Sequence, residues 1–173
     1  MPSAEMPSVP PRAAGPVLVT RPAGRGEHLA SLLEAEGLTA EHAPLTRLVP
    51  STGEELEAAL EQLAAGAFTH LVVTSRTAAE RLAGAEAPFE TAVIAVGGGT
   101  AETLRAAGLS PTAVADGSGT ALVAAMPPAA PGDRVLFPAS AAASRTVPDG
   151  LRAAGYEVVE VEAYRPEPAD PSP

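Results

Sequence analysis

Short aliphatic runs alternate along this chain with longer stretches in which apolar residues recur every three or four positions. The first run, Val17-Leu18-Val19, predicts a short buried strand, and the leucines after it predict a helix that ends at Gly37. These periodic leucines are Leu29, Leu32 and Leu33. A second strand at residues 38–43 would complete one β-α-β unit.

A connector and a second helix are expected next. Residues 44–50 begin and end with proline, which predicts a connector. Ser51 and Glu54 then stand at the spacing of a capping box, in which the two side chains satisfy the first free amides of a helix. A stripe of leucines at helical spacing supports this helix: Leu56, Leu60 and Leu63.

The rest of the chain repeats the alternation of strand and helix. Further strands are predicted at residues 69–73, 92–96, 111–115, 134–137 and 157–161. All but the last lead into a helical pattern, which predicts an α/β fold with a parallel sheet and helices on both of its faces. In such folds the ligand crevice lies at the carboxyl ends of the strands. The proline-rich residues 166–173 predict a tail or a linker.

Five of the predicted strands run into small or hydroxyl residues just before a helix start. The turns are residues 20–22, 74–76, 97–100, 116–120 and 138–140. A turn of this kind exposes free backbone N–H groups and the positive end of a helix dipole, and small residues let an anion approach the main chain. The sequence therefore predicts a binder of a ligand with several negative groups.

Composition excludes several kinds of chemistry. The chain has no Lys and no Cys, which excludes a lysine Schiff base, a P-loop lysine and thiolate catalysis. Its net charge of −10 argues against binding to nucleic acid, because affinity for phosphate backbones comes from clustered basic residues. No apolar run is long enough to span a membrane and the start lacks the pattern of a signal peptide, so a cytoplasmic location is expected.

Three local patterns each have two interpretations. Gly97-Gly98-Gly99 is either a nucleotide-binding turn or a structural one, but Glu102 stands where a G-x-G-x-x-G motif requires its last glycine. Thr74 and Ser75 are either helix caps or ligand contacts. Tyr164 either packs against a linker or has a polar role in a crevice.

Other catalytic and metal sites are not indicated. Ser75 lacks the glycine-flanked surroundings of a nucleophile elbow. The histidines lack the paired spacing of metal ligands, and each is expected to be structural: His28, His42 and His70.

Several ordered segments of the chain carry a family resemblance. They are Val17-Leu18-Val19-Thr20-Arg21-Pro22, Val72-Val73-Thr74-Ser75, Ala95-Val96-Gly97 with Thr100-Ala101, Val135-Leu136-Phe137-Pro138 and Ala163-Tyr164-Arg165. In this order and spacing they resemble uroporphyrinogen-III synthase over residues 17–166. In that family two α/β lobes are joined by a pair of linker strands, and the C-terminal part of the chain completes the lobe encoded first.

The resemblance implies one partial and one complete lobe. The proline-rich residues 1–15 predict a disordered leader. Residues 16–44 and 165–173 would form a partial first lobe, and residues 45–164 a complete inserted lobe. The family's second set of Thr-Ser and Val-Gly-x-x-Thr-Ala turns has no counterpart in this sequence. Pro166 and Thr146 also depart from the family pattern, which has threonine and an acidic residue at these positions.

The resemblance also implies a function. A member of this family is a cofactor-free lyase that closes hydroxymethylbilane, a linear tetrapyrrole with carboxylates on every ring, while inverting its last ring. By carry-over, Tyr164 would bind the leaving hydroxyl, and no metal is expected. The substrate-binding residues would be Thr20, Arg21, Thr74, Ser75, Gly97, Gly98, Thr100 and Arg145. A chain with both lobes complete would be a monomer.

Two other functions remain open from the sequence. The chain could be a noncatalytic module that holds a tetrapyrrole or another polycarboxylate. It could also be a nucleotide-binding α/β domain, an interpretation motivated by the glycines at 97–99 and opposed by Glu102.

Overall fold

The computed structural model describes residues 15–169 of the chain, which divide into two compact units. Within the described part, the first unit holds residues 15–47 and 167–169, and the second holds Leu48–Pro166. The leader predicted for residues 1–15 lies outside the described residues except for Gly15, as do the last four residues.

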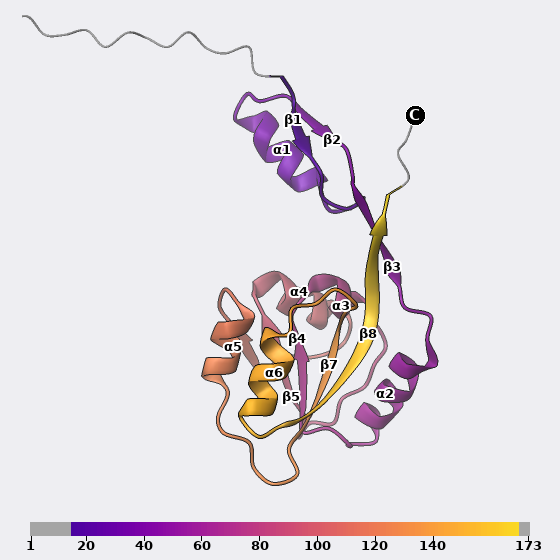
Figure 1. Ribbon diagram of the computed structural model, residues 1–173, viewed down its shortest axis with the longest axis vertical. Helices are drawn as coiled ribbons and strands as arrows, with labels where there is room; N and C mark the ends of the chain where they lie inside the picture. The colour runs from indigo at the N-terminus through magenta and orange to yellow at the C-terminus, as the bar shows by residue number, and fades with distance from the viewer. Residues whose placement is uncertain (1–14, 170–173) are drawn as a thin grey trace, which may run out of the picture. The chain divides into compact units, whose positions relative to one another are not determined.

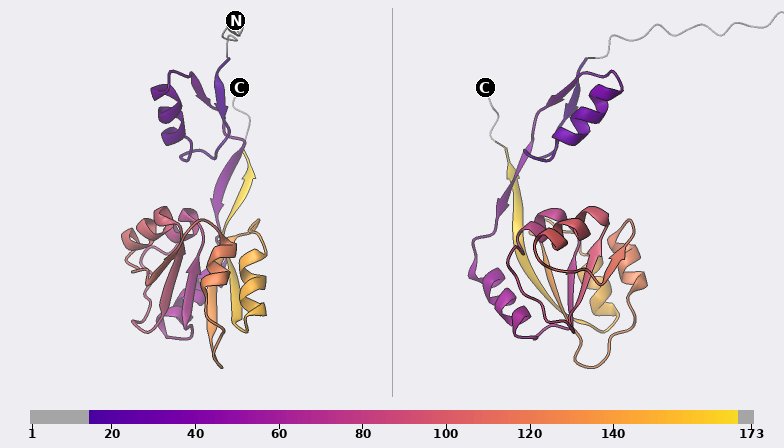
Figure 2. Two further views of the ribbon diagram at one scale, coloured as in Figure 1. Left: turned by 90° about the vertical axis from the view of Figure 1, so that its left-hand side faces the viewer. Right: turned by 180° about the vertical axis from the view of Figure 1, so that it is seen from behind.

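The six-stranded sheet has the strand order β3-β8-β7-β4-β5-β6 (Figures 1 and 2). The strands are β3 (Thr46–Pro50), β4 (His70–Val73), β5 (Ala92–Val96), β6 (Ala113–Ala115), β7 (Arg134–Ser140) and β8 (Glu157–Pro168). From β8 to β6 every neighbouring pair is parallel. β3 runs antiparallel to β8, because Ser51 N–H donates to Ala163 and Ala169 N–H donates to Leu45.

Helices cover both faces of this sheet. One core cluster joins the sheet to α2 (Glu54–Ala64), α3 (Arg76–Glu80) and α4 (Gly98–Ala106), and the other joins it to α5 (Gly119–Ala125) and α6 (Thr146–Ala153). Within β4, Leu71 and Val73 belong to the first cluster and Val72 to the second, as expected of a strand whose side chains alternate between two buried faces. The predicted α/β fold is confirmed.

The first unit contains the β-α-β segment predicted from the leucine pattern. Its elements are β1 (Val17–Val19), α1 (Glu27–Ala35) and β2 (Ala40–His42), and β1 pairs with β2 in parallel. The prediction that β1 is buried is wrong for two of its three residues. Val19 is 3% exposed, whereas Leu18 is 57% exposed, because within the described residues this two-stranded sheet has one helix to pack against.

Two expectations about the segment before α2 are also wrong. Residues 46–50 are strand β3 and not a connector, because they pair with β8. α2 begins after Gly53, and no side chain caps it, so the expected capping box of Ser51 and Glu54 does not form. The main-chain N–H of Ser51 instead donates a hydrogen bond to the carbonyl of Ala163 on β8.

One predicted turn and part of the predicted tail prove to be strand. Pro138 to Ser140 belong to β7, where Pro138 pairs in register with Val161 of β8. Proline is tolerated there because β7 pairs with β4 only at Val135 and Leu136, so the missing N–H interrupts no bond on that side. Residues 166–168 of the segment predicted as a tail or a linker belong to β8, which continues to Pro168 beside β3.

Candidate functional site

The carboxyl ends of the central parallel strands, where α3 to α6 begin, surround a pocket of about 390 Å³. We call it the hydroxyl pocket. It is lined by Thr74, Val96, Gly117, Ser118, Gly119, Thr120, Phe137, Ala143, Ser144, Thr146 and Val147. Its lining holds five hydroxyl side chains and no Arg, Asp or Glu, so its polar groups are neutral. Such a pocket is in the size range of small-molecule sites.

Ser75 connects the end of β4 to the start of α3. Its Oγ accepts a hydrogen bond of 3.1 Å from Ala78 N–H and so caps the helix, as one interpretation of the sequence had it. The same Oγ accepts a second hydrogen bond, 3.3 Å long, from the phenol of Tyr164. Both lone pairs of the oxygen are therefore used, and the Ser75 hydroxyl proton remains for an outside acceptor.

Tyr164 lies on β8, beside a bulge at Ala139 and Ser140 of the neighbouring strand β7. Its carbonyl accepts from Ala141 N–H, and its half-buried ring packs against the core cluster that contains α3 and α4. The main chain and ring hold the phenol close to the carboxyl end of β4. Its hydroxyl bond of 3.3 Å is longer than the usual 2.7–2.8 Å, so a better acceptor can replace Ser75.

The glycine turn at residues 97–100 starts α4. Gly97 has φ of +79°, a conformation that favours glycine, and its N–H donates to Ala115 of β6. The first bond within the helix runs from Ala101 N–H to the Gly97 carbonyl. The amides of Gly98, Gly99 and Thr100 thus precede the first helical donor, the N–H of Ala101, with Gly98 exposed and Thr100 buried.

The first turns of α3, α4 and α5 contain no acidic residue. Acidic side chains are favoured at this position by the helix dipole, and the chain carries 21 of them. α1 and α2 have Glu in their first turns, and α6 has Asp149. The positive ends of three helices at the carboxyl edge of the sheet are therefore not neutralised by carboxylates of their own first turns.

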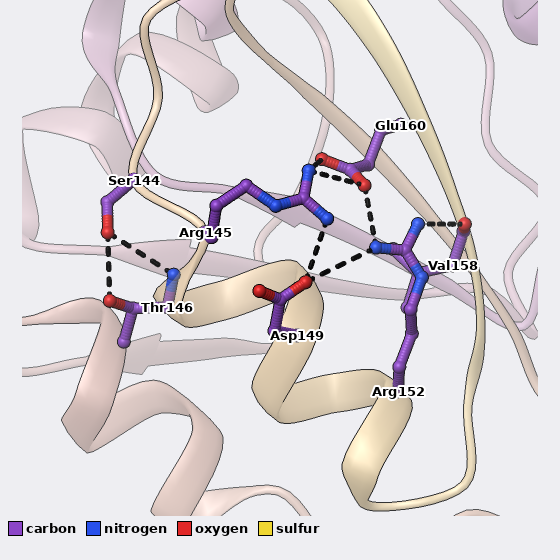
Figure 3. Close-up of polar contacts among 7 residues, drawn as sticks. All are labelled: Ser144, Arg145, Thr146, Asp149, Arg152, Val158 and Glu160. Atoms are coloured by element: carbon purple, nitrogen blue, oxygen red, sulfur yellow. Dashed lines mark hydrogen bonds and ion pairs between the residues drawn. The ribbon is translucent and has the colours of Figure 1, made fainter.

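Arg145 is held in an ion-pair network with Asp149, Arg152 and Glu160 (Figure 3). Its guanidinium donates to Asp149 at 2.8 Å and to both oxygens of Glu160 at 2.8 and 3.1 Å. Hydrogen bonds to Asp149 and then Glu160 raise the pKa of Arg145 above its ordinary value. A substrate carboxylate would have to compete with these two partners for the guanidinium.

The hydroxyls next to Arg145 lie on the other side of its turn. Ser144 and Thr146 share a hydrogen bond of 2.8 Å, and both residues line the hydroxyl pocket (Figure 3). Arg145 itself lines a smaller pocket of about 210 Å³ together with Glu160 and Glu162. The structure therefore does not place Arg145 with Thr74 in the hydroxyl pocket.

Thr20 and Arg21 belong to the first unit and are exposed there. Their main chains hold the unit together, since the Thr20 carbonyl accepts from Leu45 N–H and the Arg21 carbonyl is 2.9 Å from Nε2 of His42. The ring of His42 also lies so close to Gly26 that a Cβ on Gly26 would be 2.5 Å from Nε2.

Sequence reasoning assigned no role to several residues at the carboxyl edge. Ser118 and Thr120 line the hydroxyl pocket and come from a turn that the sequence indicated as anion-binding. Ser144 and Thr146 were missed because the turn after β7 was expected at 138–140. The side chain of Arg76 lies against Gly99, which only the folded chain reveals.

A larger pocket, of about 560 Å³, lies away from these residues. Its lining includes Phe89, Thr91 and Thr112, which precede β5 and β6, and it contains the carboxylate Glu86. Within residues 15–169 no three His, Cys, Asp or Glu side chains are grouped as a metal site would require. None of the helices in this part of the chain is long and apolar enough to cross a membrane.

These features define an α/β protein with a neutral, hydroxyl-lined pocket at the carboxyl ends of a mostly parallel sheet. The family model described as uroporphyrinogen-III synthase HemD matches residues 27–173, and the chain belongs to this family. The resemblance noted in the sequence is thereby confirmed.

Solved structures of this family are similar in fold. A mutant uroporphyrinogen III synthase from the extremely thermophilic bacterium Thermus thermophilus superimposes with a TM-score of 0.66 at 22% identity, over 90% of this chain and 64% of that one. The uroporphyrinogen-III synthetase of Helicobacter pylori gives 0.53 at 15% identity, over 77% and 58%. The chain thus spans less than two thirds of the length of these proteins. No curated protein sequence gives a significant match.

Proposed function

We propose that this chain binds hydroxymethylbilane and closes it to uroporphyrinogen III, the reaction for which its family is named. The observation that carries the proposal is the hydrogen bond between Tyr164 and Ser75 at the carboxyl end of β4. It brings a phenol to a hydroxyl whose proton is free to bind an anion, next to helix starts that lack acidic residues.

The proposed reaction is a net loss of water and needs no oxidant or cofactor. The terminal hydroxyl of the bilane leaves with a proton, which gives an azafulvene cation. The substituted carbon of the last ring attacks the exocyclic carbon of this cation, and the resulting spiro intermediate breaks its bond to the preceding bridging carbon. Reclosure at the other side of the last ring inverts it, and the proton that this ring loses balances the charge.

Tyr164 would assist the first step. Its phenol, which donates to Ser75, would donate instead to the leaving hydroxyl and stabilise the departing oxygen. The aromatic ring is packed against the core and the main chain is held in β8, so the phenol needs little reorganisation.

The substrate carboxylates would be held by main-chain amides and hydroxyls. The amides are those of Ser75, Gly98 and Thr100, and the hydroxyls are those of Thr74 and Thr100, with Gly97 shaping the turn. One helix start stabilises an anion by roughly 0.3–1 kcal/mol, whereas micromolar binding needs about 8 kcal/mol. Several of these groups must therefore act together, and Arg145 would add to them. Thr20 and Arg21 are proposed as substrate-binding residues of the first unit.

The remaining parts of the proposal concern partners and location. The ligand is a small acid and not a nucleic acid, because the chain has a net charge of −10 and no Lys. With both lobes complete, the protein would act as a cytoplasmic monomer.

A coupled assay tests the proposed activity. Freshly prepared hydroxymethylbilane is incubated with the purified chain, and the type I and type III porphyrins are separated after oxidation. Spontaneous closure gives the uninverted type I ring, so type III product above the protein-free background supports the proposal. Type I product alone overturns synthase activity of this chain.

A noncatalytic binding module is the second candidate. It is favoured by the neutral lining of the hydroxyl pocket, which offers polar groups for binding but no Arg, Asp or Glu to act as an acid or base. A ligand of the native state raises its melting temperature. A rise with uroporphyrinogen III but not with NAD or ATP, together with type I product alone, would assign the chain to this class.

A further inference from the structure

Arg76 is the first residue of α3, and its side chain extends across the start of α4. A Cβ built on Gly99 would lie 3.2 Å from Cδ of Arg76 and 3.5 Å from its Nε. The guanidinium group is thus laid against the first turn of α4, where glycine leaves room for it. Arg76 is exposed, so the guanidinium is open to a ligand.

This position is electrostatically unfavourable for a cation in the absence of an anion. The N-termini of helices carry partial positive charge, and Arg76 lies at the start of α3 and against the start of α4. Neither first turn contains an acidic residue that would compensate the added charge.

Several other arginines of this unit are neutralised within the protein, although Arg81 and Arg105 also have no carboxylate partner among the described residues. Arg134, Arg145 and Arg152 each contact a carboxylate at 2.8 Å or less. Within residues 15–169 the structure contains no ion pair or side-chain hydrogen bond of Arg76. The chain has more acidic than basic residues, yet the Arg76 guanidinium has no carboxylate partner among residues 15–169. It lies where the helix starts already make the electrostatic potential positive.

We propose that Arg76 binds one carboxylate of the ligand held at the carboxyl edge of the sheet, an inference that rests on the proposed function. The planar guanidinium can pair with both oxygens of a carboxylate, and the nearby amides of Gly98 and Gly99 add donors to the same region. The ligand's charge would compensate the unfavourable field, so Arg76 contributes to affinity at the expense of stability in the free protein.

The test compares charge-matched variants of the full chain. Arg76→Gln removes the guanidinium, and Arg105→Gln removes the same charge from the last turn of α4. The probe is uroporphyrinogen III, whose binding is followed by titration, and KM and kcat for type III formation are measured alongside. We expect Arg76→Gln to weaken binding about tenfold to a hundredfold and to raise KM, with kcat little changed. Arg105→Gln should change binding less than about twofold, because screened charges at this distance contribute little.

Stability provides a second, opposite readout. Arg76→Gln should leave the melting temperature of the ligand-free protein unchanged or raise it, because a cation is removed from two helix starts. A structural role would lower the melting temperature instead. Arg76→Lys should recover part of the affinity, since it keeps the charge but not the bidentate geometry.

The outcomes separate this inference from the proposed function. If the unchanged chain forms type III product or binds uroporphyrinogen III, and Arg76→Gln behaves like Arg105→Gln, the role of Arg76 is wrong and the function stands. A lower melting temperature of ligand-free Arg76→Gln with unchanged affinity also overturns it. If the unchanged chain neither binds nor converts these tetrapyrroles, both proposals are overturned.

Discussion

Tyr164 donates a hydrogen bond to Ser75, although the two residues are 89 positions apart in the chain. The contact exists because Tyr164 pairs with Ser140 at the end of β7, and β7 lies next to β4, so the phenol comes close to the turn between β4 and α3. Ser75 also caps α3, so one side chain fixes the start of a helix and the position of a phenol. The effect of Ser75 on the stability of α3 and its effect on the position of the Tyr164 phenol can be measured separately, by unfolding and by activity.

Replacement of Tyr164 by Phe should lower the rate of type III formation about a hundredfold, because the variant cannot donate to the leaving hydroxyl. Tyr156→Phe is the matched control, since it removes a phenol that donates to Pro127 at 2.9 Å and is not part of the candidate site. That control should lose about 1 kcal/mol of stability and little activity. The type III fraction after oxidation gives the comparison, and equal rates for Tyr164→Phe and the unchanged chain would remove Tyr164 from the proposed role.

Ser75→Ala and Ser118→Ala form a second matched pair. Both serines cap a helix, α3 through Ala78 N–H and α5 through Ala121 N–H, so each variant should lose about 1 kcal/mol in urea unfolding. Ser75 alone contacts Tyr164, so Ser75→Ala should also slow type III formation about tenfold or more through misplacement of the phenol. Because Ser118 lines the hydroxyl pocket, its variant is a control for the loss of stability only. An unchanged rate of type III formation in Ser75→Ala would mean that the contact with Tyr164 does not matter for the reaction.

The sequence was sufficient to predict the alternation of strands and helices, and with it the edge of the sheet where the turns after the strands meet. Buried parallel strands such as β4 appear as short aliphatic runs, and the loops after them collect at one edge by topology. Ser75 and Gly97 could be proposed as candidate substrate-binding residues for this reason, since each lies in a turn that comes after a strand.

Features that depend on distant partners could not be predicted in the same way. Thr46 to Pro50 form a strand only because β8 lies beside them, and their local composition resembles a loop. Pro138 is accepted inside β7 because β4 has already ended its pairing there. The contact of Arg76 with Gly99 joins two helices, and no periodicity within either helix encodes it.

The role of Arg145 can be separated from that of its network. Arg145→Gln and Arg152→Gln each remove bonds to Asp149 and Glu160, so each should change the free energy of unfolding little, as is usual for exposed ion pairs. If Arg145 binds a substrate carboxylate, Arg145→Gln should raise KM about tenfold and Arg152→Gln should not. Equal KM values in steady-state assays would leave Arg145 as a residue that fastens α6 to β8.

Close packing of α5 on α6 depends on glycine. A Cβ on Gly150 of α6 would lie 2.7 Å from Cγ1 of Val123 on α5, so Gly150→Ala forces the helices apart at a cost of about 1–3 kcal/mol. The higher helix propensity of Ala offsets about 1 kcal/mol of this destabilisation. Val123→Ala makes room for the new methyl group, so the double variant should be more stable than the sum of the single changes predicts. A coupling energy near zero in urea unfolding would contradict the steric explanation.

Burial of His70 makes stability depend on pH. The ring lies edge-on to Tyr156 with centroids 5.2 Å apart, and desolvation lowers the pKa of His70 below its ordinary 6.5, against an opposing effect of Asp133. Between the lowered folded value and 6.5, the unfolded chain binds more protons than the folded one, so stability falls as the pH drops below about 6.5. His70→Gln should remove this contribution, and its unfolding midpoint in urea should change less between pH 7.5 and 5.5 than that of the unchanged chain. His28→Gln, an exposed change on α1, should keep the full dependence. The same pH dependence in all three proteins would show that other groups, and not His70, bind the protons.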